Sequence, residues 1–163
     1  MNAFPRALPS LVLLSLSISA IATDKSITES YAKVQSAVLK KDGAALKQLW
    51  LTYVDPSCVA ERKGKKLSYK QMGDQFEQQM RVIKKVNSCK IQILSSKSKA
   101  GKVVCIVETT QSFVIAVEAK DSVFDQVSVA EDTWKKINGK YKIVGIKMTK
   151  ESLKQDGKAF PGG

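Results

Sequence analysis

The chain has 163 residues, with 27 lysines and arginines against 15 aspartates and glutamates, and it has no histidine. This length fits one domain, because domains usually contain about 100–200 residues. Without histidine there is no Ser-His-Asp or Cys-His nucleophile and no imidazole ligand for zinc, so any catalysis must use carboxylates, tyrosine, lysine or cysteine. The formal net charge of +12 indicates either an anionic partner or a well-hydrated surface.

The first 22 residues have the pattern of a secretory signal peptide. Arg6 supplies the positive start, residues 11–21 are apolar but too short to span a bilayer, and Ala20-Ile21-Ala22 is a small-x-small cleavage pattern. We therefore expect cleavage near Ala22 and a secreted or periplasmic mature protein. No later stretch is apolar enough for a transmembrane helix, so none is expected in the mature chain.

The next part of the chain predicts two helices. Ser26-Ile27-Thr28-Glu29 matches a capping box, and apolar residues at helical spacing then continue to about residue 41. Asp42-Gly43 interrupts this pattern, and Asp42 is placed to cap a short second helix. Residues 51–54 predict a strand that stops at Asp55-Pro56-Ser57.

A turn and a third helix follow. The charged residues 61–66 predict an exposed turn between two short strands. Ser68, with Gln71 three residues later, is a second capping-box match, and it begins a helix expected to end near Val86.

From residue 90 the apolar period changes to two, which is typical of strands. The predicted strands are 90–94, 103–107, 113–117, 123–137 and 141–148, and the second and third can form one long bent strand. Asn138-Gly139 predicts a tight hairpin, and residues 150–163 are expected to be a loose tail. This order predicts an α+β fold, a curved antiparallel sheet with about three N-terminal helices on its concave face.

The three cysteines leave two interpretations open. Cys89 and Cys105 lie on two apolar runs joined by a polar loop that is typical of a hairpin, so a disulfide between them is one possibility in an oxidising compartment. The other is that these two and Cys58 are all small buried hydrophobic side chains. No CxxC motif is present, and we expect neither a metal nor a cofactor.

The lysines are spread over turns, helix ends and hairpins, and only Arg62 and Arg81 follow the signal peptide as arginines. Recognition of phosphates and bases favours arginine, so this distribution disfavours nucleic acid as a partner. It favours weak adhesion to anionic envelope polymers somewhat more. Lysines beside the hairpins would also prevent edge-to-edge strand pairing.

The order of elements and several local motifs resemble the nuclear transport factor 2-like superfamily, whose α+β cone includes ketosteroid isomerase. The resemblance covers about residues 26–148, within an expected domain of 23–149. It rests on three motifs: Lys40-Lys41-Asp42-Gly43 followed by Ala-Leu-x-x-Leu-Trp, Tyr53-Val54-Asp55-Pro56, and the segment 132–144.

This resemblance implies two candidate catalytic carboxylates. Asp55 occupies the place of the general base of steroid isomerases. Asp132 occupies the place of the protonated aspartic acid with which those enzymes stabilise an oxyanion. The tyrosine of those enzymes would fall at Val34, and Tyr31 lies almost one turn earlier. The loss of one oxyanion donor typically lowers the rate by about 10²–10³. Asp55 also has a simpler interpretation as the start of a turn.

The resemblance also implies a cone that binds a ligand. Its expected lining residues are Tyr31, Val34, Trp50, Tyr53, Phe76, Met80 and Trp134. Our leading hypothesis is an exported domain that binds a small, mostly apolar molecule or serves as an interaction module. The alternatives are an isomerase- or dehydratase-like enzyme and a module that forms homodimers through its sheet face.

Overall fold

The structure, a computed structural model, describes residues 23–160. The predicted signal peptide lies outside these residues. The described chain contains helices α1 to α3 and strands β1 to β7 in the following order: α1 (Lys25–Leu39), α2 (Gly43–Tyr53), β1 (Val54–Arg62), β2 (Lys65–Ser68), α3 (Tyr69–Val82), β3 (Ile83–Lys99), β4 (Lys102–Val117), β5 (Lys120–Ile137), β6 (Lys140–Gln155) and β7 (Lys158–Ala159).

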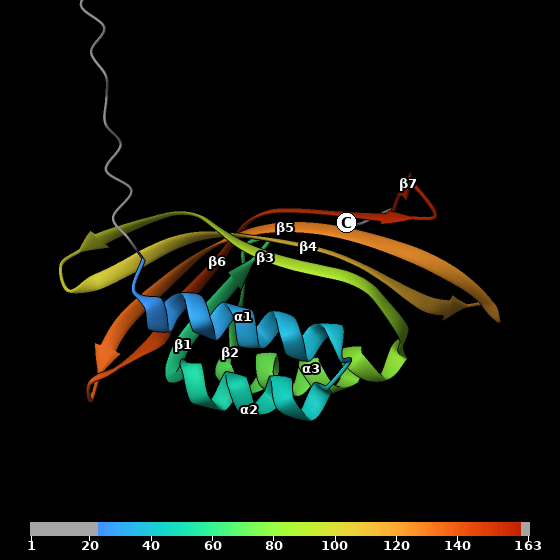
Figure 1. The fold of residues 1–163 in the computed structure, drawn as a ribbon. Coiled ribbons are helices and arrows are strands. Elements are labelled where there is room, and N and C mark those ends of the chain that lie inside the picture. The colour runs from blue at the N-terminus through green and yellow to red at the C-terminus, as the bar shows by residue number, and fades with distance from the viewer. Residues whose placement is uncertain (1–22, 161–163) are drawn as a thin grey trace, which may run out of the picture.

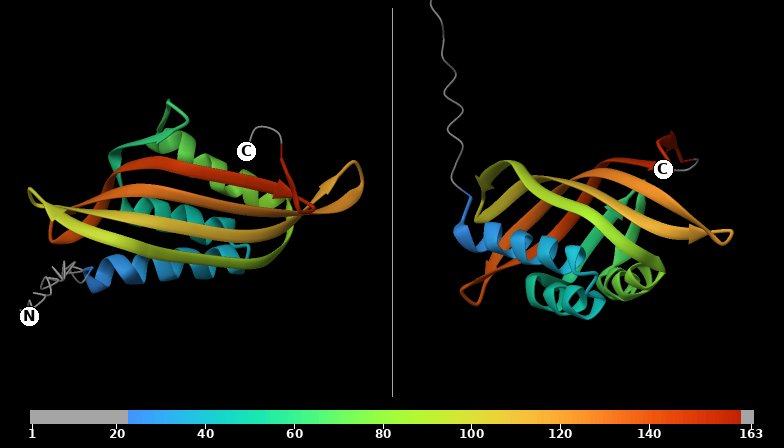
Figure 2. Two further views of the ribbon diagram at one scale, coloured as in Figure 1. Left: turned by 90° about the horizontal axis from the view of Figure 1, so that it is seen from above. Right: turned by 45° about the vertical axis from the view of Figure 1, so that its right-hand side comes forward.

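One curved sheet arches over the three helices, which cover its concave face (Figures 1 and 2). Its strand order is β2-β1-β6-β5-β4-β3, with β7 added to β6. The pairs are antiparallel except β1 and β6, which run parallel. The predicted α+β cone is therefore confirmed, although its sheet is mixed rather than purely antiparallel.

Two of the three predicted N-terminal helix caps are present in the structure. The side chain of Asp42 accepts a hydrogen bond from Ala45 N at 2.8 Å, and Ser68 and Gln71 form the predicted capping box. The predicted box at Ser26 is wrong, because Asp24 caps α1 and accepts from Ser26 N at 2.9 Å. Aspartate is among the best N-cap residues, so the helix begins at the earlier position.

The boundaries between helices and strands differ from the predicted ones at several positions. Residues 51–53 are the last turn of α2 rather than a strand, and α3 ends at Val82 instead of Val86. β1 then continues through Asp55 and Pro56. Its pairing with β6 is interrupted between Val54 and Val59, so the missing N–H of Pro56 removes no regular ladder hydrogen bond.

The long strands extend beyond the predicted ones. β4 joins both predicted segments into one strand, and Asn138-Gly139 forms the expected turn with φ of 49° and 78°. The prediction of a loose tail is wrong for residues 150–160. β6 continues to Gln155, and the ring of Phe160 packs against Phe124 with centroids 5.7 Å apart.

Of the two interpretations of the cysteines, the structure has the buried free thiols and not the Cys89–Cys105 disulfide. Cys89 is paired with Gln111, whereas Cys105 is paired with Ser96. Cys105 therefore lies opposite a residue seven positions from Cys89 along β3, roughly 23 Å away at the rise of a β-strand, which no disulfide can bridge. Both remain free thiols, as does Cys58, and all three are buried.

Candidate functional site: two cavities in the cone

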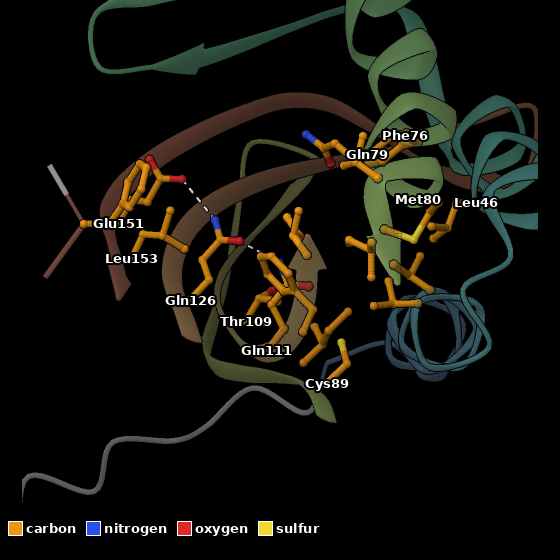
Figure 3. Close-up of a pocket in the computed structure, with 18 of the residues that line it drawn as sticks. Leu46, Phe76, Gln79, Met80, Cys89, Thr109, Gln111, Gln126, Glu151 and Leu153 are labelled. Carbon is orange, nitrogen blue, oxygen red and sulfur yellow. Dashed lines mark hydrogen bonds between the residues drawn. The ribbon is translucent and has the colours of Figure 1, made fainter. Parts of the chain in front are cut away.

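Two adjoining cavities lie between the helices and the concave face of the sheet. The first, of about 220 Å³, contains Asp132 and is called the Asp132 cavity; the second, of about 440 Å³, contains Glu151 and is called the Glu151 cavity (Figure 3). The residues that line both are Val34, Leu46, Phe76, Ile91 and Thr109. The space inside the cone is therefore elongated, with a different polar group in each part.

The seven residues expected to line the cone all border one of these cavities. Tyr31, Val34, Trp50, Tyr53, Phe76 and Trp134 line the Asp132 cavity, and Met80 lines the Glu151 cavity. Helical spacing on α1, α2 and α3 directs six of these side chains toward the sheet, and Trp134 points toward them from β5. Their position agrees with the expected geometry, and a role in ligand binding stays a prediction.

Three side chains form a hydrogen-bonded chain in the Asp132 cavity. Trp134 Nε1 donates to Tyr31 Oη at 3.0 Å, and Tyr31 Oη donates to Asp132 Oδ2 at 2.6 Å. The rings of Tyr31 and Trp134 also meet edge to face, with centroids 5.5 Å apart. Asp132 and Trp134 are buried, and this arrangement joins helix α1 to strand β5.

Burial shifts the acid–base properties of this group. It raises the pKa of Asp132 from 3.8 to about 6, although the hydrogen bond from Tyr31 acts in the opposite direction. The pKa of Tyr31 is far above its ordinary value because of burial and the adjacent charge of Asp132. Burial and the charge of Asp132 raise the pKa of the Cys105 thiol to about 11. The cavity thus disfavours negative charge.

Asp55 lies outside the lining of both cavities. Its side chain accepts from Ser57 N at 2.9 Å and from Ser57 Oγ at 2.5 Å, and these hydrogen bonds hold its pKa below the ordinary value. Val54 faces the core, so strand alternation directs the side chain of Asp55 away from it. The structure therefore leaves Asp55 outside the cavity that contains Asp132, and Asp55 makes local hydrogen bonds to Ser57 within β1 instead.

Tyr31 reaches Asp132 but has no hydrogen left for a ligand oxygen. Its single O–H donates to Asp132, while its oxygen accepts from Trp134. Val34, at the position where the resemblance places the oxyanion-binding tyrosine, lines the cavity with an apolar side chain. The site is therefore better suited to holding an apolar body than to stabilising an oxyanion.

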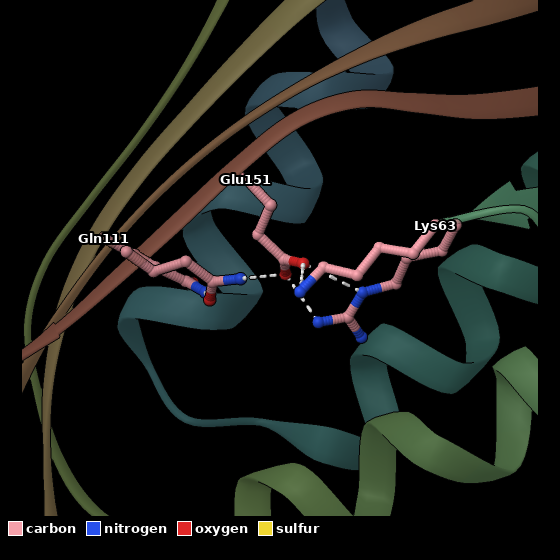
Figure 4. Close-up of polar contacts among 5 residues, drawn as sticks. Lys63, Gln111 and Glu151 are labelled. Atoms are coloured by element: carbon pink, nitrogen blue, oxygen red, sulfur yellow. Dashed lines mark hydrogen bonds and ion pairs between the residues drawn. The ribbon is translucent and has the colours of Figure 1, made fainter. Parts of the chain in front are cut away.

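The Glu151 cavity contains a polar ladder that crosses three strands (Figures 3 and 4). Gln111 Nε2 donates to Gln126 Oε1 at 2.6 Å, and Gln126 Nε2 donates to Glu151 Oε1 at 3.1 Å. Arg62 closes the ladder with two contacts to the Glu151 carboxylate, at 2.5 Å from Nη2 and 3.1 Å from Nε. The side chain of Glu151 is only 6% exposed, and Lys63 Nζ lies 4.0 Å from it.

Replacing Arg62 with methionine is expected to lower the free energy of unfolding by about 1–3 kcal/mol, because a buried carboxylate loses its bidentate partner. This loss is smaller than the loss expected when one partner of a fully buried ion pair is removed, because Arg62 is half exposed. Urea denaturation measures the loss. The matched variant Lys63→Met, which removes the longer contact to Glu151 at 4.0 Å, should lose less stability; equal losses would contradict the assignment of Arg62 as the main partner.

Sequence reasoning missed this ladder. Its signal was present, because Gln111 and Gln126 are each two residues from an apolar Phe113 or Phe124 and therefore share the inward face of their strands. Glu151 was missed because it was assigned to the tail.

Within residues 23–160, no group of three or more cysteine, aspartate or glutamate side chains is arranged to hold a metal ion. In the same part of the chain, no helix has the length and apolar character needed to cross a bilayer.

Comparison with known proteins gives the fold. No protein-family model and no curated protein matches the sequence, but solved structures do. A protein from Kribbella flavida has a TM-score of 0.61 and 7% identity over 77% of this chain and 90% of its own. A nuclear transport factor 2-like protein from Salmonella enterica has a TM-score of 0.54 and 14% identity over 83% of this chain and 91% of its own.

A third structure, a nuclear transport factor 2-like protein from Cytophaga hutchinsonii, has a TM-score of 0.51 and 14% identity over 76% of this chain and 93% of its own. The chain has the nuclear transport factor 2-like fold. In this nuclear transport factor 2-like cone, the curved sheet and the three helices enclose the two cavities described above.

Proposed function

We propose that this protein is a binding domain that holds a small, mostly apolar ligand in its cone. The observation that carries this proposal is the Asp132 cavity, an apolar space of about 220 Å³ with one buried carboxyl group. Ligand sites typically combine an apolar lining with a few fixed polar groups, and this cavity has that composition. The adjoining Glu151 cavity offers further space, lined by apolar side chains and by the polar ladder.

The polar groups suggest how the ligand is oriented. Asp132 is held in place by Tyr31, so a hydroxyl or amine of the ligand can donate to the carboxyl group while its apolar part contacts Trp50 and Phe76. In the Glu151 cavity, the amides of Gln111 and Gln126 supply donors and acceptors that are already fixed by the ladder. Fixed polar groups lower the entropic cost of binding.

We further propose that the protein acts outside the cytoplasm, after removal of a signal peptide near Ala22. The sequence pattern of residues 1–22 supports this proposal. Dimerisation through the sheet face stays a prediction. The enzyme alternative has less support, because Asp55 does not line the cavity that contains Asp132.

The test is a titration with N-phenylnaphthylamine, an apolar fluorescent amine. We expect saturable binding to the wild-type protein and about a tenfold or greater loss of affinity in Ala130→Phe, because Ala130 lines the Asp132 cavity and a phenyl ring would fill it. Leu51→Phe adds a similar ring on the exposed side of α2 and should leave the affinity unchanged. No binding by the wild type, or equal affinity for all three proteins, would contradict a ligand-binding cone.

A further inference from the structure

Four lysines stand directly opposite one another across four neighbouring strands. Lys99 on β3 is paired with Lys102 on β4, Lys102 with Lys135 on β5, and Lys135 with Lys142 on β6. We call these four residues the lysine row. Neighbouring strands are about 4.8 Å apart, so the row spans roughly 14 Å across the sheet. It lies where the β3–β4 and β5–β6 hairpins end on the same side of the molecule (Figure 2).

The lysine row faces outward, on the convex side of the sheet. Val103 and Trp134 are paired with each other, and Trp134 is 1% exposed in the core. Their neighbours Lys102 and Lys135 therefore point to the opposite face. Three members of the row are exposed; Lys142 is half-buried, and its ammonium also donates to the carbonyl oxygen of Thr52.

This arrangement is unfavourable for the folded protein by itself. Like charges directly opposite each other destabilise paired strands, and here three such pairs follow in succession. Protection of a sheet edge explains Lys99, because β3 is an edge strand, but Lys102 and Lys135 lie on strands that are paired on both sides. The hydrogen bonds from Ser57 lower the pKa of Asp55 most, and the charges of Lys142 and Lys135 lower it further, so this carboxylate offsets part of the repulsion.

We propose that the lysine row binds an acidic polysaccharide. A linear polyanion laid across the strands can place successive carboxylate or sulfate groups over successive ammonium groups, which relieves their mutual repulsion. Binding of this kind is independent of any ligand in the cone, because the row and the cavities lie on opposite faces of the sheet.

The chemistry of the row favours a polysaccharide over a nucleic acid. All four side chains are lysines, which act as point charges, whereas base and phosphate recognition makes frequent use of arginine forks. Single-stranded nucleic acid is also held by aromatic platforms. The aromatic residues next to the row in sequence, Trp134 and Tyr141, belong to the opposite face by strand alternation.

The proposal is tested with heparin as the polysaccharide probe. The double variant Lys102→Gln/Lys135→Gln should bind heparin about tenfold or more weakly than the wild type, with a smaller salt dependence of affinity because fewer counterions are released. The control Lys85→Gln/Lys90→Gln removes the same charge from exposed positions of β3 away from the row, and should change affinity by less than about twofold.

Two further measurements complete the test. Lys102→Gln/Lys135→Gln should unfold at a temperature equal to or above that of the wild type, because like-charge pairs have been removed. A lower unfolding temperature would overturn the interpretation that the lysines of the row repel one another. An equal loss of heparin affinity in both double variants would overturn the proposal, because diffuse surface charge would then account for the binding. Tighter binding of oligothymidylate, or of vesicles of anionic lipid, than of heparin would overturn the choice of a polysaccharide.

Discussion

Replacing Trp134 with alanine is expected to lower the free energy of unfolding by about 3–5 kcal/mol, the range for large aromatic side chains removed from a core. Trp134 is 1% exposed, and its ring meets the Tyr31 ring edge to face. Its loss removes both this packing and the hydrogen bond from Nε1 to Tyr31 Oη. Urea denaturation followed by far-ultraviolet circular dichroism measures the change.

Two controls separate packing from hydrogen bonding. Trp134→Phe keeps an aromatic ring but loses the indole N–H, so its loss should be smaller, about 1–2 kcal/mol. Leu94→Ala removes an apolar side chain that is 49% exposed, and should change the stability by less than about 1 kcal/mol. If Trp134→Ala is as mild as Leu94→Ala, the assignment of Trp134 to the core is incorrect.

Replacing Asp132 with asparagine is expected to remove a pH dependence of stability. The folded protein holds a proton on Asp132 up to a pKa of about 6, whereas the unfolded chain releases it near the ordinary value of 3.8. Between these values the folded state binds more protons, so stability falls as pH rises. The total effect of this one group is on the order of 3 kcal/mol and is complete above about pH 6.

The measurement is the difference in unfolding free energy between Asp132→Asn and the wild type from pH 4 to pH 7. We expect this difference to shift in favour of the variant as pH rises, while the contributions of other carboxylates cancel. Tyr31→Phe is the matched variant. It removes the hydrogen bond that lowers the pKa of Asp132, so the window should move to higher pH. A difference that does not change with pH would contradict the raised pKa.

The outcome also bears on function. If Asp132 retains its proton near pH 6, it can donate a hydrogen bond to a ligand in mildly acidic surroundings and accept one at higher pH. Ligand affinity and its pH dependence would then report on the same group. Asp55, with a lowered pKa and a hydrogen bond from Ser57 within β1, does not line the cavity.

The sequence by itself was sufficient for most of the elements and for the class of fold, because helical and strand periodicities and two of the helix caps are local properties. Asp42, Ser68 and Asn138-Gly139 act on backbone within a few residues, and the structure has them as predicted. Boundaries were less accurate where tertiary packing extends an element, as at residues 51–53 and 150–159.

Only the tertiary structure decided which residues meet, because register depends on contacts between distant segments. Register separates Cys89 from Cys105, and it aligns four lysines that are dispersed in the sequence. It also turns Asp55 away from the cavity while Tyr31 reaches Asp132 across 101 positions of sequence. The net charge and the absence of histidine limited the possible chemistry, but folding determined where the remaining charges act.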